Sequence, residues 1–124
     1  MQTLLDTNAL LRYLLNDIPD QAERVRRAVE EGACTLPEII CECVFVLISP
    51  KIYGFGREEV ADALEKLLDE ISCERTPELV RALDLFATTR LDFVDCIIAA
   101  TRELDGNEVL TFDEKLGRLM RRMG

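Results

Sequence analysis

The sequence predicts an α/β protein in which short strands alternate with longer helices around a mostly parallel sheet. Several stretches have apolar residues at helical spacing, and short segments with strand-like composition lie between them. The chain has 124 residues, of which 48% are hydrophobic, and this suits a single domain over residues 1–124 with one core. Because strands that alternate with helices typically form a parallel sheet covered by helices, we expect that architecture here.

Glycine and proline residues mark the expected elements of the amino-terminal part. The apolar pair Leu4-Leu5 can end a buried strand, and the leucines of residues 8–15 have the 3-4 spacing of a helix. Residues 19–31 begin with a proline, which favours the first position of a helix, and Gly32 is suited to stop that helix. We expect a short strand over residues 33–36.

The middle of the chain predicts two helices, a short strand and the start of another helix. Residues 37–49 begin with proline and stop before a second proline, so a helix is expected there. Residues 57–68 are amphipathic, with Val60, Leu64, Leu67 and Leu68 on one side. Residues 72–74 can form a short strand. Thr76-Pro77 resembles a helix cap followed by proline at the first helical position.

The last part of the chain predicts a helix, a strand and a final helix. Asp92 can cap a helix that ends near Gly106. Residues 108–112 have the β-rich composition of a strand, and Asp113 is expected to begin a helix that reaches Met123.

Composition excludes several classes of site. The chain has no histidine, and its five cysteines contain no C-x-x-C pair, which disfavours a zinc site and any His-activated nucleophile. We therefore interpret the cysteines as reduced core residues. The net charge of −9 argues against broad, non-specific phosphate binding, although two basic clusters, expected on solvated helix faces, interrupt the acidic sequence: Arg24, Arg26 and Arg27, and Arg118, Arg121 and Arg122.

No segment is long and apolar enough to span a bilayer, so we expect no membrane association. The first residues lack the basic start and small-residue cleavage site of a signal peptide, which makes a cytoplasmic location the natural expectation.

Four acidic residues predict a metal site. Glu42 and Asp95 are each the one charged residue of an otherwise apolar helical stretch, and a buried carboxylate without a partner is costly. Asp6 follows the first expected strand and Asp113 follows the last one, and ligands of α/β folds gather at that edge of the sheet. Because Mg²⁺ and Mn²⁺ prefer carboxylate oxygens, this set suits metal-assisted phosphodiester hydrolysis.

Each of these acids also has a structural interpretation. Asp6 and Asp113 can cap the helices that follow them, and Glu42 can pair with an arginine in the core. Asp95 lies early in its helix, where the helix dipole favours an acid, and Asp92 is interpreted as a simple cap. It is less probable that all four acids have only structural roles than that any single one of them does.

The same positions carry a resemblance to a known family. Four segments, matched in order and spacing, resemble the acidic motifs of PIN-domain proteins, especially VapC-type toxins: residues 4–15, residues 42–47, residues 92–100 and residues 110–116. The resemblance covers essentially the whole chain.

The resemblance implies a three-layer α/β/α sandwich with a parallel sheet and a pocket for Mg²⁺ or Mn²⁺. It implies endoribonuclease activity on RNA, a small antitoxin as protein partner, and a homodimer. Carried over to this sequence, the metal-binding and water-activating acids are Asp6, Glu42, Asp95 and Asp113, and Asn8 and Thr111 support the pocket by hydrogen bonding. Arg12 and the Arg118–Arg122 cluster are candidates for RNA contact.

Two other function classes stay open at this point. A non-catalytic module that binds a protein partner would also fit the acidic surface and the amphipathic helix over residues 57–68. A phosphatase with a carboxylate nucleophile is disfavoured, because no Asp-x-Asp pair follows the first expected strand.

Overall fold

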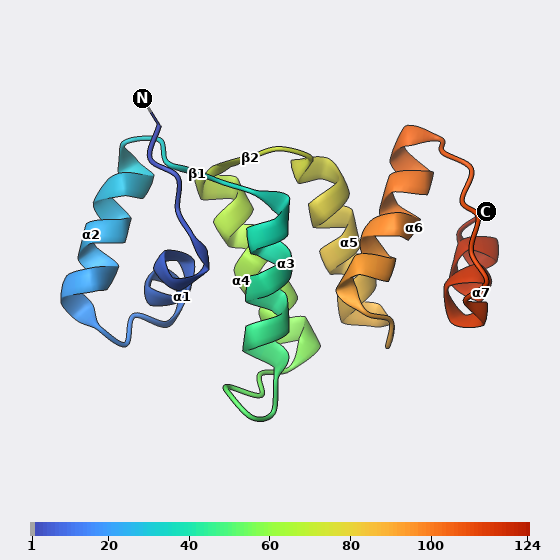
Figure 1. The fold of residues 1–124 in the computed structure, drawn as a ribbon, viewed down its shortest axis with the longest axis horizontal. Helices are drawn as coiled ribbons and strands as arrows, with labels where there is room; N and C mark the ends of the chain where they lie inside the picture. Colours follow the sequence, from blue (N-terminus) through green and yellow to red (C-terminus); the bar gives the residue numbers. More distant parts are fainter. Residues whose placement is uncertain (1) are drawn as a thin grey trace. The chain divides into compact units, whose positions relative to one another are not determined.

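The computed structural model describes residues 2–124, and in these residues short parallel strands are combined with helices (Figure 1). The chain separates into two compact units, an amino-terminal unit that ends at Glu74 and a carboxy-terminal unit that begins at Arg75. The elements in chain order are α1 (Thr7–Leu15), α2 (Pro19–Glu30), β1 (Cys34–Thr35), α3 (Pro37–Ile48), α4 (Arg57–Glu70), β2 (Ser72–Cys73), α5 (Thr76–Thr88), α6 (Phe93–Asp105) and α7 (Glu114–Met123).

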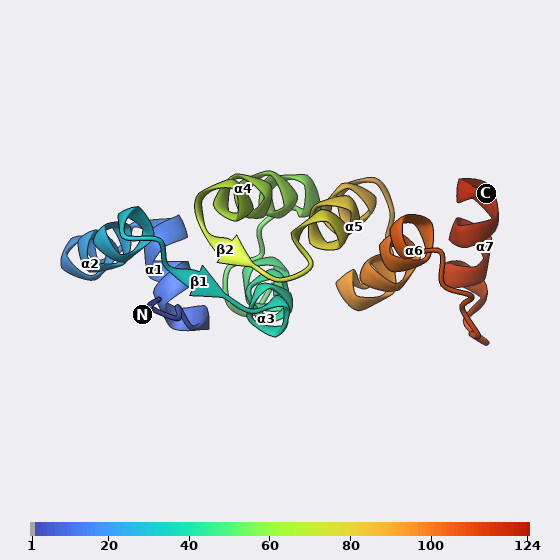
Figure 2. The same ribbon diagram turned by 90° about the horizontal axis from the view of Figure 1, so that it is seen from above.

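A short parallel sheet organises the amino-terminal unit. Strand β1 pairs with β2 in parallel, with Cys34 opposite Ser72, and the two arrows lie side by side in Figure 2. Leu4 adds a single parallel bridge to Cys34, so the strand expected at Leu4-Leu5 is reduced to that bridge. The buried hydroxyl of Thr35 donates to the Leu5 carbonyl at 2.9 Å, which fastens the start of the chain to β1.

The helices of this unit begin and end close to where the sequence predicts. Proline occupies the first turn of both α2 and α3, where its missing N–H has no helical partner to lose. Gly32 follows α2 with φ +87°, a conformation that favours glycine. The core of the unit is apolar and includes Leu10, Ile40 and Leu64, whose exposed fraction is 0%. These helices therefore bury their expected faces.

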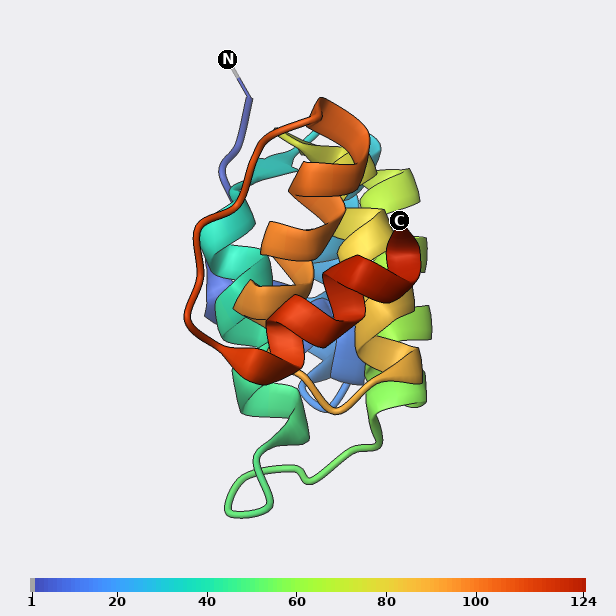
Figure 3. The same ribbon diagram turned by 90° about the vertical axis from the view of Figure 1, so that its right-hand side faces the viewer.

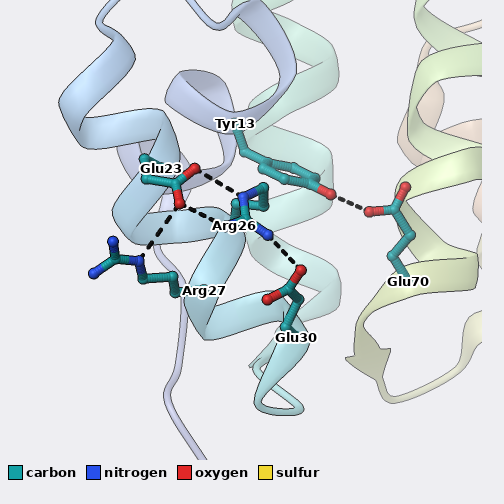
Figure 4. A network of polar contacts seen from close by, with 6 residues as sticks. All are labelled: Tyr13, Glu23, Arg26, Arg27, Glu30 and Glu70. Carbon is teal, nitrogen blue, oxygen red and sulfur yellow. Dashed lines mark hydrogen bonds and ion pairs between the residues drawn. The ribbon is translucent and has the colours of Figure 1, made fainter.

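Figure 4 shows two sets of polar contacts at the surface of the same unit, one between α1 and α4 and one within α2. The Tyr13 hydroxyl on α1 donates to a carboxylate oxygen of Glu70 at the end of α4. On α2, Arg26 pairs with Glu23 and with Glu30, one turn away on either side. Arg27 also pairs with Glu23, at 3.5 Å. The first basic cluster is thus a solvated helix face whose arginines 26 and 27 have carboxylate partners, as expected.

The carboxy-terminal unit packs α5 against α6 and α6 against α7. Phe86 of α5 and Phe93 of α6 meet edge to face, with ring centroids 5.7 Å apart. Arg81 and Glu103 join the same two helices by an ion pair of 2.6 Å. The prediction that Thr76 caps α5 is wrong by one residue, because Arg75 takes the cap position with φ +61° and Thr76 is the first helical residue.

The strand predicted over residues 108–112 is not formed. Figure 3 shows an extended connection from α6 to α7, and no strand pairing joins it to any part of residues 2–124. Leu110 and Phe112 are 88% and 94% exposed. Residues with high β-propensity favour a strand because they fit a paired, half-buried surface. Residues 108–112 have such a composition but no partner strand among residues 2–124, so they do not form a strand.

No helix within residues 2–124 has the length and apolar character needed to cross a membrane. The expectation of one domain over residues 1–124 stays a prediction.

Candidate functional site

Asp6 lies at the start of α1 and caps it. One carboxylate oxygen, Oδ1, accepts a hydrogen bond from the Ala9 backbone N–H at 2.8 Å. The side chain is exposed, and it lines a hollow of about 350 Å³ together with Asn8 and Arg12. The capping interpretation of Asp6 is therefore confirmed. It leaves the second carboxylate oxygen free of that capping bond, since a cap uses one oxygen.

Glu42 is exposed on α3, so the expectation that its carboxylate is buried is wrong. Its neighbour Cys43 faces the core and is fully buried, because adjacent residues of a helix point to different sides. Within residues 2–124 Glu42 has no ion-pair partner, so the alternative of a core arginine does not hold.

Asp6 and Glu42 lie near the same thiol. Burial raises the pKa of Cys43 to about 12, and the negative charges of Glu42 and then Asp6 add to the rise. A pKa responds to charges in its neighbourhood, so the two acids share one region of the amino-terminal unit. Sequence separation alone could not show this proximity, since 35 residues lie between them.

Arg12 of α1 lies in the same hollow as Asp6. Its Nη1 lies 3.4 Å from Asp17, its Nη2 donates to the Tyr53 hydroxyl at 3.3 Å, and its Nε is buried without a hydrogen-bond partner. The arginine is largely buried, with 16% of its side chain exposed. It therefore holds the connection after α3 as well as lining the hollow next to Asp6.

Asp95 and Asp113 form a second acidic pair, in the carboxy-terminal unit. Asp95 is half-buried in the first turn of α6. Burial raises the pKa of its carboxyl, and the negative charges of Asp113 and then Asp92 raise it further. Crowded carboxylates that disfavour each other's ionised form are relieved by a bound cation, so this pair suits a metal chemically.

Asp113 has a capping bond and a local support. Its Oδ1 accepts from the Leu116 backbone N–H at 2.8 Å, which confirms the predicted helix cap. The Thr111 hydroxyl accepts from the Asp113 backbone N–H at 3.0 Å, and this bond orients the residue from the preceding segment. The contact fits the supporting role expected for Thr111. Asn8 lies two residues from Asp6 in the hollow, and its role stays a prediction.

Asp92 differs from its predicted role. It occupies the cap position of α6, but its side chain makes no capping hydrogen bond. Its exposed carboxylate instead adds negative charge next to Asp95. The interpretation of Asp92 as a simple cap rests on how often aspartate precedes a helix, and it is wrong for the side chain.

Each unit thus contains two of the four predicted acids: Glu42 and Asp6 both raise the pKa of the Cys43 thiol, and Asp113 raises the pKa of Asp95. Over residues 2–124 no group of three or more carboxylates and thiols is assembled around one point where a metal ion would be held. The donor set itself fits Mg²⁺ or Mn²⁺, because exposed or half-buried carboxylate oxygens are the ligands that these ions prefer. The four-acid site stays a prediction.

Two basic residues were missed by the sequence analysis. Arg90 and Lys115 line the same groove as the predicted Arg118–Arg122 cluster, in the carboxy-terminal unit. Arg90 precedes α6, and no spacing rule connects it with residues in the last helix. Its charge next to Thr89 and Leu91 gave no periodic signal.

Comparison with known proteins gives one family. The family model of the PIN domain matches residues 3–121, which is nearly the full chain. No curated protein matches, and no solved structure matches. The PIN domain has a three-layer α/β/α fold, so the predicted fold class is confirmed, and the helices and small parallel sheet described above agree with it.

Proposed function

Because this chain belongs to the PIN domain family, a nuclease fold, we propose that it is a divalent-metal-dependent endoribonuclease. The observation that supports this most is that the family match spans all four predicted acids. Two of them raise the pKa of the same thiol, and the other two lie close enough for one to raise the pKa of the other. PIN domains typically use Mg²⁺ or Mn²⁺, and the carboxylate donors of this chain suit those ions.

The proposed site contains Asp6, Glu42, Asp95 and Asp113 as metal-holding and water-activating acids. When bound, a divalent ion would lower the pKa of a water molecule and stabilise the charge that grows on the phosphoryl group. The crowding of acids that raises the pKa of Asp95 would be relieved by a bound cation, which supports its role as a metal ligand. Hydrolysis joins the water oxygen to phosphorus and breaks the phosphorus–oxygen bond to the next nucleotide, and the leaving oxygen takes up a proton.

Capping bonds give two of these acids a fixed orientation. Asp6 and Asp113 each use Oδ1 for a backbone N–H of the following helix, so each carboxylate is held in one rotamer. A preorganised acid loses little side-chain entropy when a cation binds. The structural and catalytic interpretations of these residues are therefore compatible.

We further propose that the protein is the toxin of a type II toxin–antitoxin pair, similar to VapC toxins. The four motif segments of the sequence support this assignment. The corresponding partners are an RNA substrate, a small antitoxin protein and a second copy of the chain in a homodimer. Cleavage of cellular RNA by such a toxin implies a cytoplasmic site of action.

The first test is cleavage of a mixed panel of structured and single-stranded RNAs by the purified protein, with Mg²⁺ or Mn²⁺ and with EDTA. The informative variant is Asp6→Asn, because asparagine caps a helix as well as aspartate does and the fold should persist. We expect metal-dependent cleavage that falls about 100-fold or more in this variant. The matched control is Asp69→Asn, which removes an exposed carboxylate near the end of α4.

Full activity of Asp6→Asn would contradict the proposal. A folded protein that cuts none of the RNAs, yet binds a protein partner tightly, would favour the non-catalytic interaction module. Circular dichroism of both variants decides whether a loss of activity reflects chemistry or unfolding.

A further inference from the structure

The carboxy-terminal unit contains a groove whose rim is strongly basic. The groove has a volume of about 610 Å³ and runs from the end of α5 to α7. We call it the basic groove, defined by its cations Arg90, Lys115, Arg118, Arg121 and Arg122. Its remaining lining residues are two threonines and a leucine, so no acidic side chain lines it.

Most of these cations have no neutralising partner. Of the five, Arg118 is paired, with Glu114 at 3.9 Å, and within residues 2–124 no ion pair involves Arg90, Lys115, Arg121 or Arg122. The arginines of α2 are different, because Arg26 sits between two glutamates. A charge without a partner remains available to an anionic ligand.

The charge of the chain is unevenly distributed between the units. Residues 1–74 have 15 acidic and 7 basic side chains, whereas residues 75–124 have 9 acidic and 8 basic ones. The net charge of −9 therefore resides almost entirely in the amino-terminal unit. The acidic average of the chain, which argued against phosphate binding, does not describe the surface around the basic groove.

The geometry of α7 spreads its cations along the groove. Residues 115, 118 and 122 follow 3-4 helical spacing, so they form a stripe that rises about 10 Å along the helix. Gly117 lies under Arg121, whose Nη1 is 3.4 Å from the point where a Cβ would be built. A stripe of this length exceeds what one phosphate needs and suits a polyanion.

The threonines of the groove offer no free donor to a ligand. The Thr88 hydroxyl donates to the Asp84 carbonyl at 3.1 Å, and the Thr89 hydroxyl donates to the Leu85 carbonyl at 2.8 Å. Both bonds stay within the last turn of α5. The donors that the groove offers a ligand are therefore those of its cationic side chains, and arginine and lysine are the side chains that most often contact phosphates.

The apolar face of α7 is already used. Leu116, Leu119 and Met120 are buried, with exposed fractions of 1%, 5% and 7%. A basic helix that lies on a membrane inserts its apolar face into the lipid, and α7 has no such face to offer. We propose that the basic groove binds the phosphate backbone of single-stranded RNA, an assignment that rests on the proposed ribonuclease function.

The test measures binding without cleavage. Fluorescence anisotropy of a labelled single-stranded RNA of about 12 nucleotides is recorded in EDTA over a series of salt concentrations. The informative variant is Arg121→Ala/Arg122→Ala. The matched control, Arg26→Ala/Arg27→Ala, removes the same charge from arginines that are paired on α2.

The expected result is a difference in salt dependence. Five phosphate contacts predict a slope of log K against log salt of about −3.5, so affinity falls about 100-fold between about 50 and 200 mM salt. With two contacts removed, the slope becomes about −2 and the fall about 20-fold. The control should keep the steeper slope. Circular dichroism confirms that both variants fold.

Three outcomes would overturn the assignment. These are no RNA binding by the wild type, equal slopes for the wild type and Arg121→Ala/Arg122→Ala, or displacement of RNA by polyglutamate at equal charge concentration. The last would indicate an acidic protein partner. RNA binding with the expected slopes in a protein that cuts no RNA would reject the ribonuclease but keep the groove, so the two proposals fail separately.

Discussion

Replacing Tyr13 by phenylalanine is expected to destabilise the amino-terminal unit by about 1 kcal/mol. The change removes the hydroxyl that donates to Glu70 and leaves the ring in place. A hydrogen bond to a charged acceptor contributes about 1.5–3 kcal/mol when it is shielded from water. Glu70 is exposed, so solvent screening lowers the contribution towards 1 kcal/mol, equivalent to a fall of about 3–5 °C in the melting temperature.

The same contact gives the prediction a spectroscopic signature. The hydrogen bond to Glu70, burial and the charge of Glu70 raise the pKa of Tyr13 from 10.0 to about 12. The chain has two tyrosines and no tryptophan, so Tyr53→Phe leaves Tyr13 as the one phenol that absorbs on ionisation. An ultraviolet titration of that variant is expected to have its midpoint near pH 12.

The dependence of stability on pH follows from the sign of this shift. A phenol whose pKa is higher in the folded state stabilises the fold fully below its unfolded value, and the contribution disappears as pH rises through the folded value. The difference between wild type and Tyr13→Phe should therefore be constant up to about pH 10 and vanish towards pH 12. Urea denaturation followed by circular dichroism measures it, with Tyr53→Phe as the control.

A Tyr13→Phe variant as stable as the wild type at neutral pH would refute the reasoning. A titration midpoint near pH 10 in Tyr53→Phe would also refute it, because it would mean that the Tyr13 hydroxyl does not donate a hydrogen bond to Glu70. A normal midpoint with a large loss of stability would assign the effect to other contacts of the Tyr13 hydroxyl rather than to the hydrogen bond with Glu70.

Other substitutions test separate contacts. Gly117→Ala is expected to raise the stability of α7 by about 0.5–1 kcal/mol in urea denaturation, because glycine inside a helix costs that much relative to alanine. A loss of stability would mean that the Arg121 side chain cannot move away from the new methyl group. Asp113→Ser should keep the cap on Leu116 and the melting temperature while abolishing RNA cleavage, whereas Asp113→Ala should also lose about 1 kcal/mol; retained cleavage by the serine variant would remove Asp113 from the proposed site. Arg26 holds the pKa of Glu23 at about 2, so the ion pair stabilises α2 above pH 4.5 and is lost as pH falls towards 2; helicity measured over this range should fall less in Arg26→Ala than in the wild type, and identical acid profiles would contradict the pairing.

The helices were predictable because their signals are local. Proline in the first turn of α2 and α3, and the glycines at 32 and 106, mark helix ends through backbone conformation that no distant residue has to supply. The capping bonds of Asp6 and Asp113 were predictable for the same reason, since the acceptor lies three residues before its donor.

The remaining features depend on contacts between distant residues. A strand over residues 108–112 requires a partner strand, and composition cannot state whether one is present. Glu42 is exposed because α3 buries a different face of the helix. The residues on both sides of Glu42 in the sequence are apolar, so the sequence does not indicate which face is buried. Arg90 reaches the basic groove through the packing of α5, α6 and α7, which leaves no pattern along the chain.

The exposed connection between α6 and α7 also makes a point at which the chain can be cut. Leu110 and Phe112 are the most exposed large apolar residues described, and proteases that prefer such side chains cleave accessible, unpaired backbone. A single cut after Phe112 would leave residues 113–124 as a short peptide with four basic and two acidic side chains. It would be held by its buried leucines and methionine and by the hydrogen bond that Arg102 donates to the Met120 carbonyl. After a single cut, α7 would still line the basic groove but would no longer be covalently attached, so it could dissociate.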